Sequence, residues 1–306
     1  LVGSEMCIRD RNQISWVRNF EPLNPITISR WPTRGGIYEP LYIYNPIKAD
    51  WIPWLSTDFK WQDNNKKLIF SIRSDVKWSD GMPFSAHDVA YTFNLAKEFP
   101  ALDTRNYWDY LKSVVAVSDS EIEVNFKRIN VPGFDAIAEA IIVPKHIWSE
   151  VIDPLKFSNP NPVGTGPYTE ILSFNSQVWE LGKNHNYWQL GKPHVEKLIF
   201  PTFSSNEQAT LALLSGKLDW AGAFIPAIDR IYVDKDPEHH HYWFRNTGHS
   251  TFLLTNTKDP VLGDVNVRKA ISYAIDREQV VKVGTYNYTT PAHVTSPVSY
   301  THLTLP

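Results

Sequence analysis

The sequence predicts a mixed α and β fold (α/β, with α+β character), on three observations. Leu68 to Arg73 and Glu121 to Phe126 are rich in β-forming residues or alternate apolar and polar residues, which is typical of strands. Gln208 to Ser215 and Val267 to Val280 repeat apolar residues at helical spacing. The 22 prolines exceed the 14 glycines and mark many loop corners, which argues against an all-helical bundle.

The first predicted helix begins at Ser85, directly after a turn. In the segment from Ser79 to Pro83, Asp80 can bond its own backbone and Gly81 can supply the positive φ of an Asp-Gly turn. Ser85 is then a plausible N-cap, and Asp88, three residues later, can complete a capping box. We therefore expect a strand, a turn and a capped helix in succession.

Two further helices are predicted towards the C-terminal end. The helix from Gln208 to Ser215 should stop at Gly216, which can adopt the left-handed conformation that ends many helices. The segment from Val267 to Val280 is predicted to be one helix with charged residues opposite an apolar face. That face consists of Val267, Ala270, Ile271, Ala274 and Ile275.

The segment from Pro162 to Tyr168 places two glycines between two prolines. This pattern predicts a stiff, sharply turned crossing of the chain. A phosphate-binding loop is the alternative interpretation, but the spacing matches neither the Walker nor the dinucleotide pattern, and no Lys follows the second Gly. We therefore expect a structural role.

Composition excludes several classes of partner. With 306 residues and 42% hydrophobic content, the chain can bury a sizeable core and holds two domains or pieces of three. A net charge of −3 leaves no global basic field to hold nucleic acid or anionic lipid. No run reaches the ~18 apolar residues of a spanning helix. Contact with a membrane would therefore come through a partner or a missing lipid anchor.

No catalytic residue, metal site or cofactor is predicted. The sequence lacks the G-x-S-x-G and H-E-x-x-H motifs, and its single cysteine, Cys7, excludes paired-cysteine metal sites. The run His239-His-His241 invites a metal hypothesis. However, adjacent residues of a strand point to opposite faces, so a solvated connector is the favoured interpretation.

Aromatic residues are numerous: 12 Trp, 14 Tyr and 15 Phe. Trp and Tyr suit stacking on a sugar ring or lining a pocket for a peptide side chain. Most large aromatics are nevertheless buried. We assign Trp54, Trp78, Phe84 and Phe93 to packing.

Several segments together resemble one known family. The stretch from Val76 to Phe93 is followed by the one from Asn161 to Tyr168, and further segments fall in the family order: Tyr38-Glu-Pro-Leu-Tyr, Trp51-Ile-Pro-Trp-Leu, Leu68-Ile-Phe-Ser-Ile-Arg, Leu214-Ser-Gly-Lys-Leu-Asp and Val267 to Val280. The chain thus resembles the family 5 extracellular solute-binding proteins, the peptide- and oligosaccharide-capturing subunits of ABC importers.

The resemblance implies a two-lobed periplasmic-binding-protein-like fold of type II with an extra inserted domain. It implies a periplasmic or extracellular protein, with or without a lipid anchor, that captures a short peptide between the lobes and delivers it to the permease subunits. An oligosaccharide such as a β-glucoside is the alternative ligand. A secreted glycoside-active enzyme and a nickel binder carry less weight.

Family topology also implies the domain limits. The first lobe would comprise 12–46 and 163–255, the inserted domain 47–162, and the start of the second lobe 256–298. Most of that second lobe, and with it half of the cleft, would lie outside the sequence. The ends, 1–11 and 299–306, are similar to translated sequencing adapters and are expected to be artefacts, with genuine disordered tails as the alternative.

Six residues are candidates for the cleft. Trp31 and Tyr38 lie in a loop of the first lobe, and Trp220, Phe224 and Ile225 follow the strand end at Asp219, where this architecture faces its ligand. Asn256 lies near the crossing to the second lobe.

Overall fold

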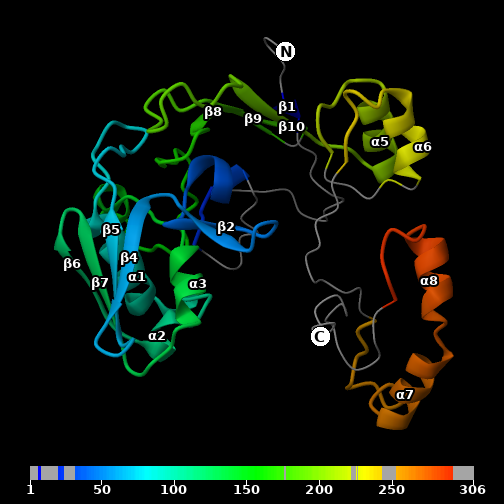
Figure 1. Cartoon of the computed structure of the whole chain (residues 1–306), viewed down its shortest axis with the longest axis horizontal. Helices are drawn as coiled ribbons and strands as arrows, with labels where there is room; N and C mark the ends of the chain where they lie inside the picture. Colours follow the sequence, from blue (N-terminus) through cyan, green and yellow to red (C-terminus); the bar gives the residue numbers. More distant parts are fainter. Residues whose placement is uncertain are drawn as a thin grey trace. The chain divides into compact units, whose positions relative to one another are not determined.

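The computed structural model describes residues 6–7, 20–23, 32–175, 177–221, 225, 227–242 and 253–291. Phe224 and Trp31 fall outside these ranges. The chain forms two compact units, 1–222 and 223–306, and each is described by itself. Figure 1 shows α and β elements in the first unit and helices in the second, so the predicted mixed class is confirmed.

One four-stranded antiparallel sheet has the strand order β4-β5-β7-β6. Its strands are β4 (Ser56–Gln62), β5 (Lys67–Ile72), β6 (Leu111–Ser118) and β7 (Glu121–Phe126). Leu68 pairs with Val124 and Phe70 with Ile122, and all four are buried, so one face of the sheet belongs to the core. Both strands expected from sequence are confirmed as β5 and β7.

Helix α1 (Ala86–Glu98) packs against β6 and β7 and confirms the predicted cap. The Ser85 side chain accepts from the His87 amide, and Asp88 Oδ2 accepts from the Ser85 amide at 2.9 Å. Asp88 is buried, and its other oxygen accepts from the Lys145 amide at 2.9 Å. One carboxylate therefore starts α1 and joins it to α4 (Lys145–Trp148).

A second sheet has the order β1-β10-β9-β8. Its strands are β1 (Met6–Cys7), β8 (Glu170–Phe174), β9 (Val178–Gly182) and β10 (Lys197–Pro201). Trp179 packs against Phe20, Phe174 and Phe200 at its inner face. β1 runs parallel to β10 and lies in the segment 1–11, which we expected to be an artefact or a disordered tail.

The remaining elements of the first unit are short. β2 (Tyr42–Asn45) and β3 (Asp50–Pro53) form a separate hairpin. The helical elements are a π-helix (Pro32–Ile37), a 3₁₀ turn (Pro100–Leu102), α2 (Tyr107–Tyr110), α3 (Gly133–Ala138) and α5 (Asn206–Leu214). Gly216 follows α5 with φ +70°, which confirms the predicted helix end.

The second unit contains α6 (Ile228–Ile231), a 3₁₀ turn (Val233–Lys235), α7 (Val265–Ala274) and α8 (Arg277–Gly284). The single helix predicted from Val267 to Val280 was therefore wrong. The chain leaves the helical conformation at Ile275, and the Asp276 side chain accepts from the Gln279 amide at 2.9 Å. A good N-cap inside an apolar repeat thus starts a new helix.

The core of the first unit confirms the packing assignments for the four aromatic residues. Trp78, Phe84 and Phe93 are at most 3% exposed, and Trp54, which is half-buried, packs against the same core. Trp78 and Phe84 contact each other edge to face across the turn between them. Among the described residues, no helix is both long enough and apolar enough to cross a membrane.

Candidate functional site

The two glycines of the crossing let two backbones meet. A Cβ at Gly164 would lie 1.9 Å from the carbonyl oxygen of Ile37, and one at Gly166 would lie 2.2 Å from that of Gly36. The Gly166 amide donates to the Ile37 carbonyl at 2.9 Å, and the Tyr168 amide donates to that of Gly36 at 2.9 Å. Only glycine fits such a close approach, which confirms the structural interpretation of this segment.

Other loops join the crossing at the same point. The Ser79 amide donates to the Gly164 carbonyl at 2.9 Å. From the connection between β9 and β10, the Asn184 side chain donates to the Gly166 carbonyl at 2.9 Å, and the Asn186 side chain donates to the Ser79 carbonyl at 3.0 Å. We call this convergence of residues 36–39, 79, 164–168 and 184–188 the joint.

Glu39 is the buried charge of the joint, and sequence reasoning missed it. Glu39 is 3% exposed, and its carboxylate accepts hydrogen bonds from three aromatic side chains. Trp54 Nε1 donates to Oε1 at 2.7 Å, and the Tyr187 hydroxyl donates to the same oxygen at 2.9 Å. Trp188 Nε1 donates to Oε2 at 3.1 Å. The carboxylate thus connects three aromatic side chains from two distant segments.

Burial dominates the electrostatics of this cluster. It raises the pKa of Glu39 to about 7, although the side chains of Trp54, Trp188, Tyr187 and Thr165 act in the opposite direction. The pKa of the Tyr187 hydroxyl is also raised, first by burial and then by Glu39. Glu39 therefore changes its charge near neutral pH.

A cation and a second carboxylate lie on the outer side of the cluster. The Arg73 guanidinium carbon lies 4.4 Å from the centroid of the Trp188 ring, a cation–π contact. Arg73 also makes a bidentate pair with Asp75, both bonds being 2.9 Å long. Trp188 is therefore held by a carboxylate at its nitrogen and by a guanidinium over its face.

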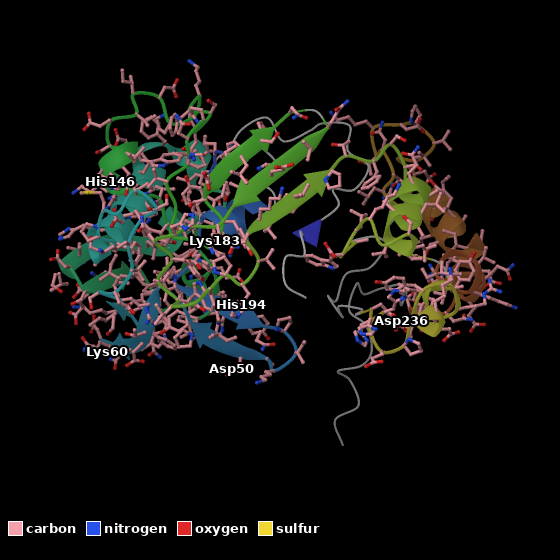
Figure 2. All side chains as sticks on the ribbon, turned by 90° about the horizontal axis from the view of Figure 1, so that it is seen from above. Asp50, Lys60, His146, Lys183, His194 and Asp236 are labelled. Carbon is pink, nitrogen blue, oxygen red and sulfur yellow. The ribbon has the colours of Figure 1, made fainter. Side chains whose placement is uncertain are left out.

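The carboxylates of Asp80 and Asp88, which the sequence analysis assigned to a turn and a helix start, have hydrogen-bond partners within the fold. Asp80 Oδ1 accepts from the Met82 amide at 3.1 Å, as the predicted turn requires. Its Oδ2 lies 2.7 Å from Nε2 of His146, which is labelled in Figure 2. Asp80 and Asp88 therefore serve the turn and the helix start to which the sequence assigned them.

The histidine run makes local contacts in the second unit. His239 Nδ1 lies 3.0 Å from Oδ1 of Asp236, which is also labelled in Figure 2. The His240 ring stacks on Tyr232 with centroids 4.0 Å apart. Within the described ranges, no three His, Cys, Asp or Glu side chains gather in a way that could hold a metal ion.

Of the predicted cleft residues, Tyr38 and Trp220 belong to the first unit. Tyr38 is fully buried, and its hydroxyl lies 2.6 Å from the Asn159 side-chain nitrogen that donates to it. Trp220 is 49% exposed and follows the buried Leu218 by two residues. Trp220 is thus half-exposed, whereas the ring of Tyr38 belongs to the core.

Ile225 and Asn256 belong to the second unit. Ile225 is buried at 3% exposure. Asn256 is exposed, and its side-chain oxygen accepts from the Lys258 amide at 3.1 Å in a turn ahead of α7. The four candidates thus divide between the two units, and their meeting at one cleft stays a prediction.

A signal for the missed cluster was present in the sequence. Glu39 sits among Ile37, Tyr38 and Leu41, all of them large and apolar. An acidic residue in such a run is expected to be buried with partners, because an unpaired buried charge is costly. What the sequence could not show is that Tyr187 and Trp188 supply those partners.

Comparison with known proteins gives a family-level match. The profile described as "Bacterial extracellular solute-binding proteins, family 5 Middle" matches residues 50–304. The nickel-binding periplasmic protein of Escherichia coli is 26% identical over 90% of this chain. The oligopeptide-binding protein OppA of Bacillus subtilis is 26% identical over 82% of it.

A solved structure is similar over nearly the whole chain. The mannohexaose-bound periplasmic oligopeptide-binding protein of Thermotoga maritima has a TM-score of 0.81 at 28% identity and covers 94% of the chain. The match spans 54% of that protein, 54% of the Escherichia coli relative and 50% of the Bacillus relative. The chain therefore spans about half the length of these proteins and shares the type II binding-protein fold with them.

Proposed function

Because the chain belongs to the bacterial extracellular solute-binding proteins of family 5, we propose that it is the substrate-binding part of an ABC importer and captures a short peptide. The family match over residues 50–304 is the observation that carries this proposal. The peptide would be held between two lobes and delivered to the membrane permease subunits. Location outside the cytoplasm follows from the family, and attachment to the membrane would come through the permease or a lipid anchor.

The mechanism is hinge closure without chemistry on the ligand. A ligand that contacts both lobes favours the closed state, and only this difference in affinity between open and closed states shifts the population. Trp220 is the described candidate whose exposure suits ligand contact. Trp31, Phe224 and Asn256 remain proposed contacts, and Tyr38 and Ile225, which are buried, would act through packing and not through direct contact.

An oligosaccharide is the second candidate ligand. The Thermotoga protein that this chain resembles was solved with mannohexaose bound, although it is described as an oligopeptide-binding protein. A half-exposed indole such as that of Trp220 can stack on a sugar ring as well as on a peptide side chain. Nickel, named for the Escherichia coli relative, stays a third candidate that no side-chain group in the described ranges supports.

Calorimetric titration with two ligand panels tests the proposal, on a protein that includes the complete second lobe that we predict. We expect saturable heat from tri- to nonapeptides and none from mannohexaose or cello-oligosaccharides. Saturable binding of the sugars alone would replace the peptide by an oligosaccharide. Mass spectrometry of the sugar after incubation adds a control, because shortened products would mean that the protein is an enzyme.

A further inference from the structure

The two carboxylate oxygens of Glu39 accept different numbers of hydrogen bonds from the aromatic side chains around them. Oε1 accepts from both Trp54, at 2.7 Å, and Tyr187, at 2.9 Å. Oε2 accepts from Trp188, at 3.1 Å. Of these three aromatic donors, two bond Oε1 and one bonds Oε2, so a proton meets less competition from them at Oε2.

Protonation at Oε2 has a specific structural effect. A carboxylate accepts hydrogen bonds with both oxygens, but the protonated oxygen of a carboxylic acid is itself a donor. Its hydrogen would compete with the indole hydrogen of Trp188 for the same space, so that bond weakens. The two bonds at Oε1 are kept because that oxygen stays an acceptor.

We propose that Glu39 is a proton-responsive latch: its ionised carboxylate holds the indole of Trp188 in the joint, and a proton from solvent at Oε2 releases that indole. The segment 184–188 then keeps its bonds at Asn184, Asn186 and Tyr187 but loses the one at its C-terminal end. Trp188 is half-buried and contacts Trp54 edge to face, so its release would loosen that ring contact as well.

The position of Trp188 lets the latch affect a contact between two sheets of the first unit. Trp188 follows the β9 strand and lies under the Arg73 guanidinium at the end of β5. Releasing the indole therefore also loosens the contact between the second sheet's connection and the sheet β4-β5-β7-β6. The latch thus acts between the parts that we predict to be the first lobe and the inserted domain.

The titratable and charged groups near Glu39 are compatible with a proton at this carboxylate. Tyr187 is the titratable group that bonds Glu39 directly, and Arg73, paired with Asp75, faces the far side of Trp188. Burial and then the hydrogen bonds set the pKa of Glu39 near 7, within the range that an extracellular medium spans.

Indole NMR on the full chain with ¹⁵N-labelled tryptophan tests the latch. The Nε1–H signal of Trp188, assigned with Trp188→Phe, should move between pH 9 and pH 5 with a midpoint near pH 7, and that of Trp54 should move less. Glu39→Gln should abolish the transition. Glu123→Gln is the matched control, since Glu123 bonds Lys67 and Asn125 on the sheet, and should leave the transition unchanged.

Two outcomes would overturn the proposal: a Trp188 signal that does not move in the wild type, or one that moves equally in Glu39→Gln. A second measurement covers the case in which Glu39→Gln fails to fold. With ¹³C-labelled glutamate carboxyls, Trp188→Phe should move the Glu39 midpoint to higher pH, because the indole bond favours the ionised form. An unchanged midpoint would show that Trp188 does not sense the charge of Glu39.

Discussion

Helices α1 and α7 begin in the same way and differ in what they bury. The Ser85 side chain caps α1 by accepting from the His87 amide, and the Asp264 side chain caps α7 by accepting from the Asn266 amide. Eight residues of α1 are buried. The structure describes every residue of α7 and α8, and none of them is buried. Capping thus fixes where a helix begins, but tertiary packing supplies most of its stability.

The aspartates at the starts of α1 and α7 also differ in burial. Asp88 is buried and bonds amides of two helices, while Asp264 is exposed and serves its own helix alone. We therefore expect substitutions in the first region to change the free energy of unfolding by several kcal/mol, and comparable ones in the second to change it little.

The largest effect is expected at Trp78. Trp78→Ala removes a fully buried indole from the core and should lower the free energy of unfolding by about 3–5 kcal/mol. Urea denaturation followed by circular dichroism measures the loss. A change below about 1 kcal/mol would mean that the site collapses around the cavity and that burial overstates its contribution.

Changing pH should reveal the buried charge of Glu39. Because its pKa is raised in the folded state to about 7, Glu39 adds stability that is complete below its unfolded pKa of 4.5 and is lost as pH rises through 7. The loss should reach about 2–3 kcal/mol between pH 5 and pH 8. Urea midpoints across this range should fall in the wild type and stay flatter in Glu39→Gln; parallel slopes would contradict the assignment.

Replacing the two helix-start aspartates compares their contexts directly. Asp88→Ala leaves the part-buried amides of Ser85 and Lys145 without their acceptor and should cost about 2–3 kcal/mol. Asp264→Ala removes an exposed cap and should cost about 1 kcal/mol. Chemical denaturation of both variants measures the difference, and equal losses would remove the contrast between the two regions.

Trp220 should separate binding from stability. Trp220→Ala shortens a side chain that is 49% exposed and should cost less than about 1 kcal/mol of folding free energy. If it contacts the ligand, the affinity should fall by about 1–3 kcal/mol. Paired denaturation and calorimetric titration decide this, and normal binding together with early unfolding would place the cleft elsewhere.

The smallest effect is expected at Tyr273 in α7. Its side chain is 84% exposed, so Tyr273→Ala should change the free energy of unfolding by no more than about 0.5 kcal/mol. The thermal midpoint of the variant provides the measurement. A marked drop would mean that the face of α7 is covered in solution.

Sequence reasoning succeeded where the signal was local. The alternation of β7, the capping box of Ser85 and Asp88, the positive φ of Gly216 and the two crossing glycines each depend on residues within one short segment. The same logic failed at Asp276, because the apolar repeat around it favoured continuity while the local cap started a new helix.

The candidate site was harder to predict, because its partners are distant in sequence. Glu39 is completed by Tyr187 and Trp188, which follow it only after the whole β4-β5-β7-β6 sheet. Tyr38 is another example: its place in a loop pattern suggested exposure, yet its hydroxyl is bonded by Asn159 inside the core. No periodicity links residues so far apart.

The glycine crossing also bears on the order in which the chain folds. The bond between the Gly166 amide and the Ile37 carbonyl closes a loop that contains the complete β4-β5-β7-β6 sheet and α1. Closing so long a loop costs chain entropy before the contacts at its ends can form. Contacts between residues so distant in sequence therefore slow folding. We expect the enclosed sheet and helix to assemble first, since their pairings are shorter in range. Their formation would shorten the effective loop and make the final closure of the crossing fast.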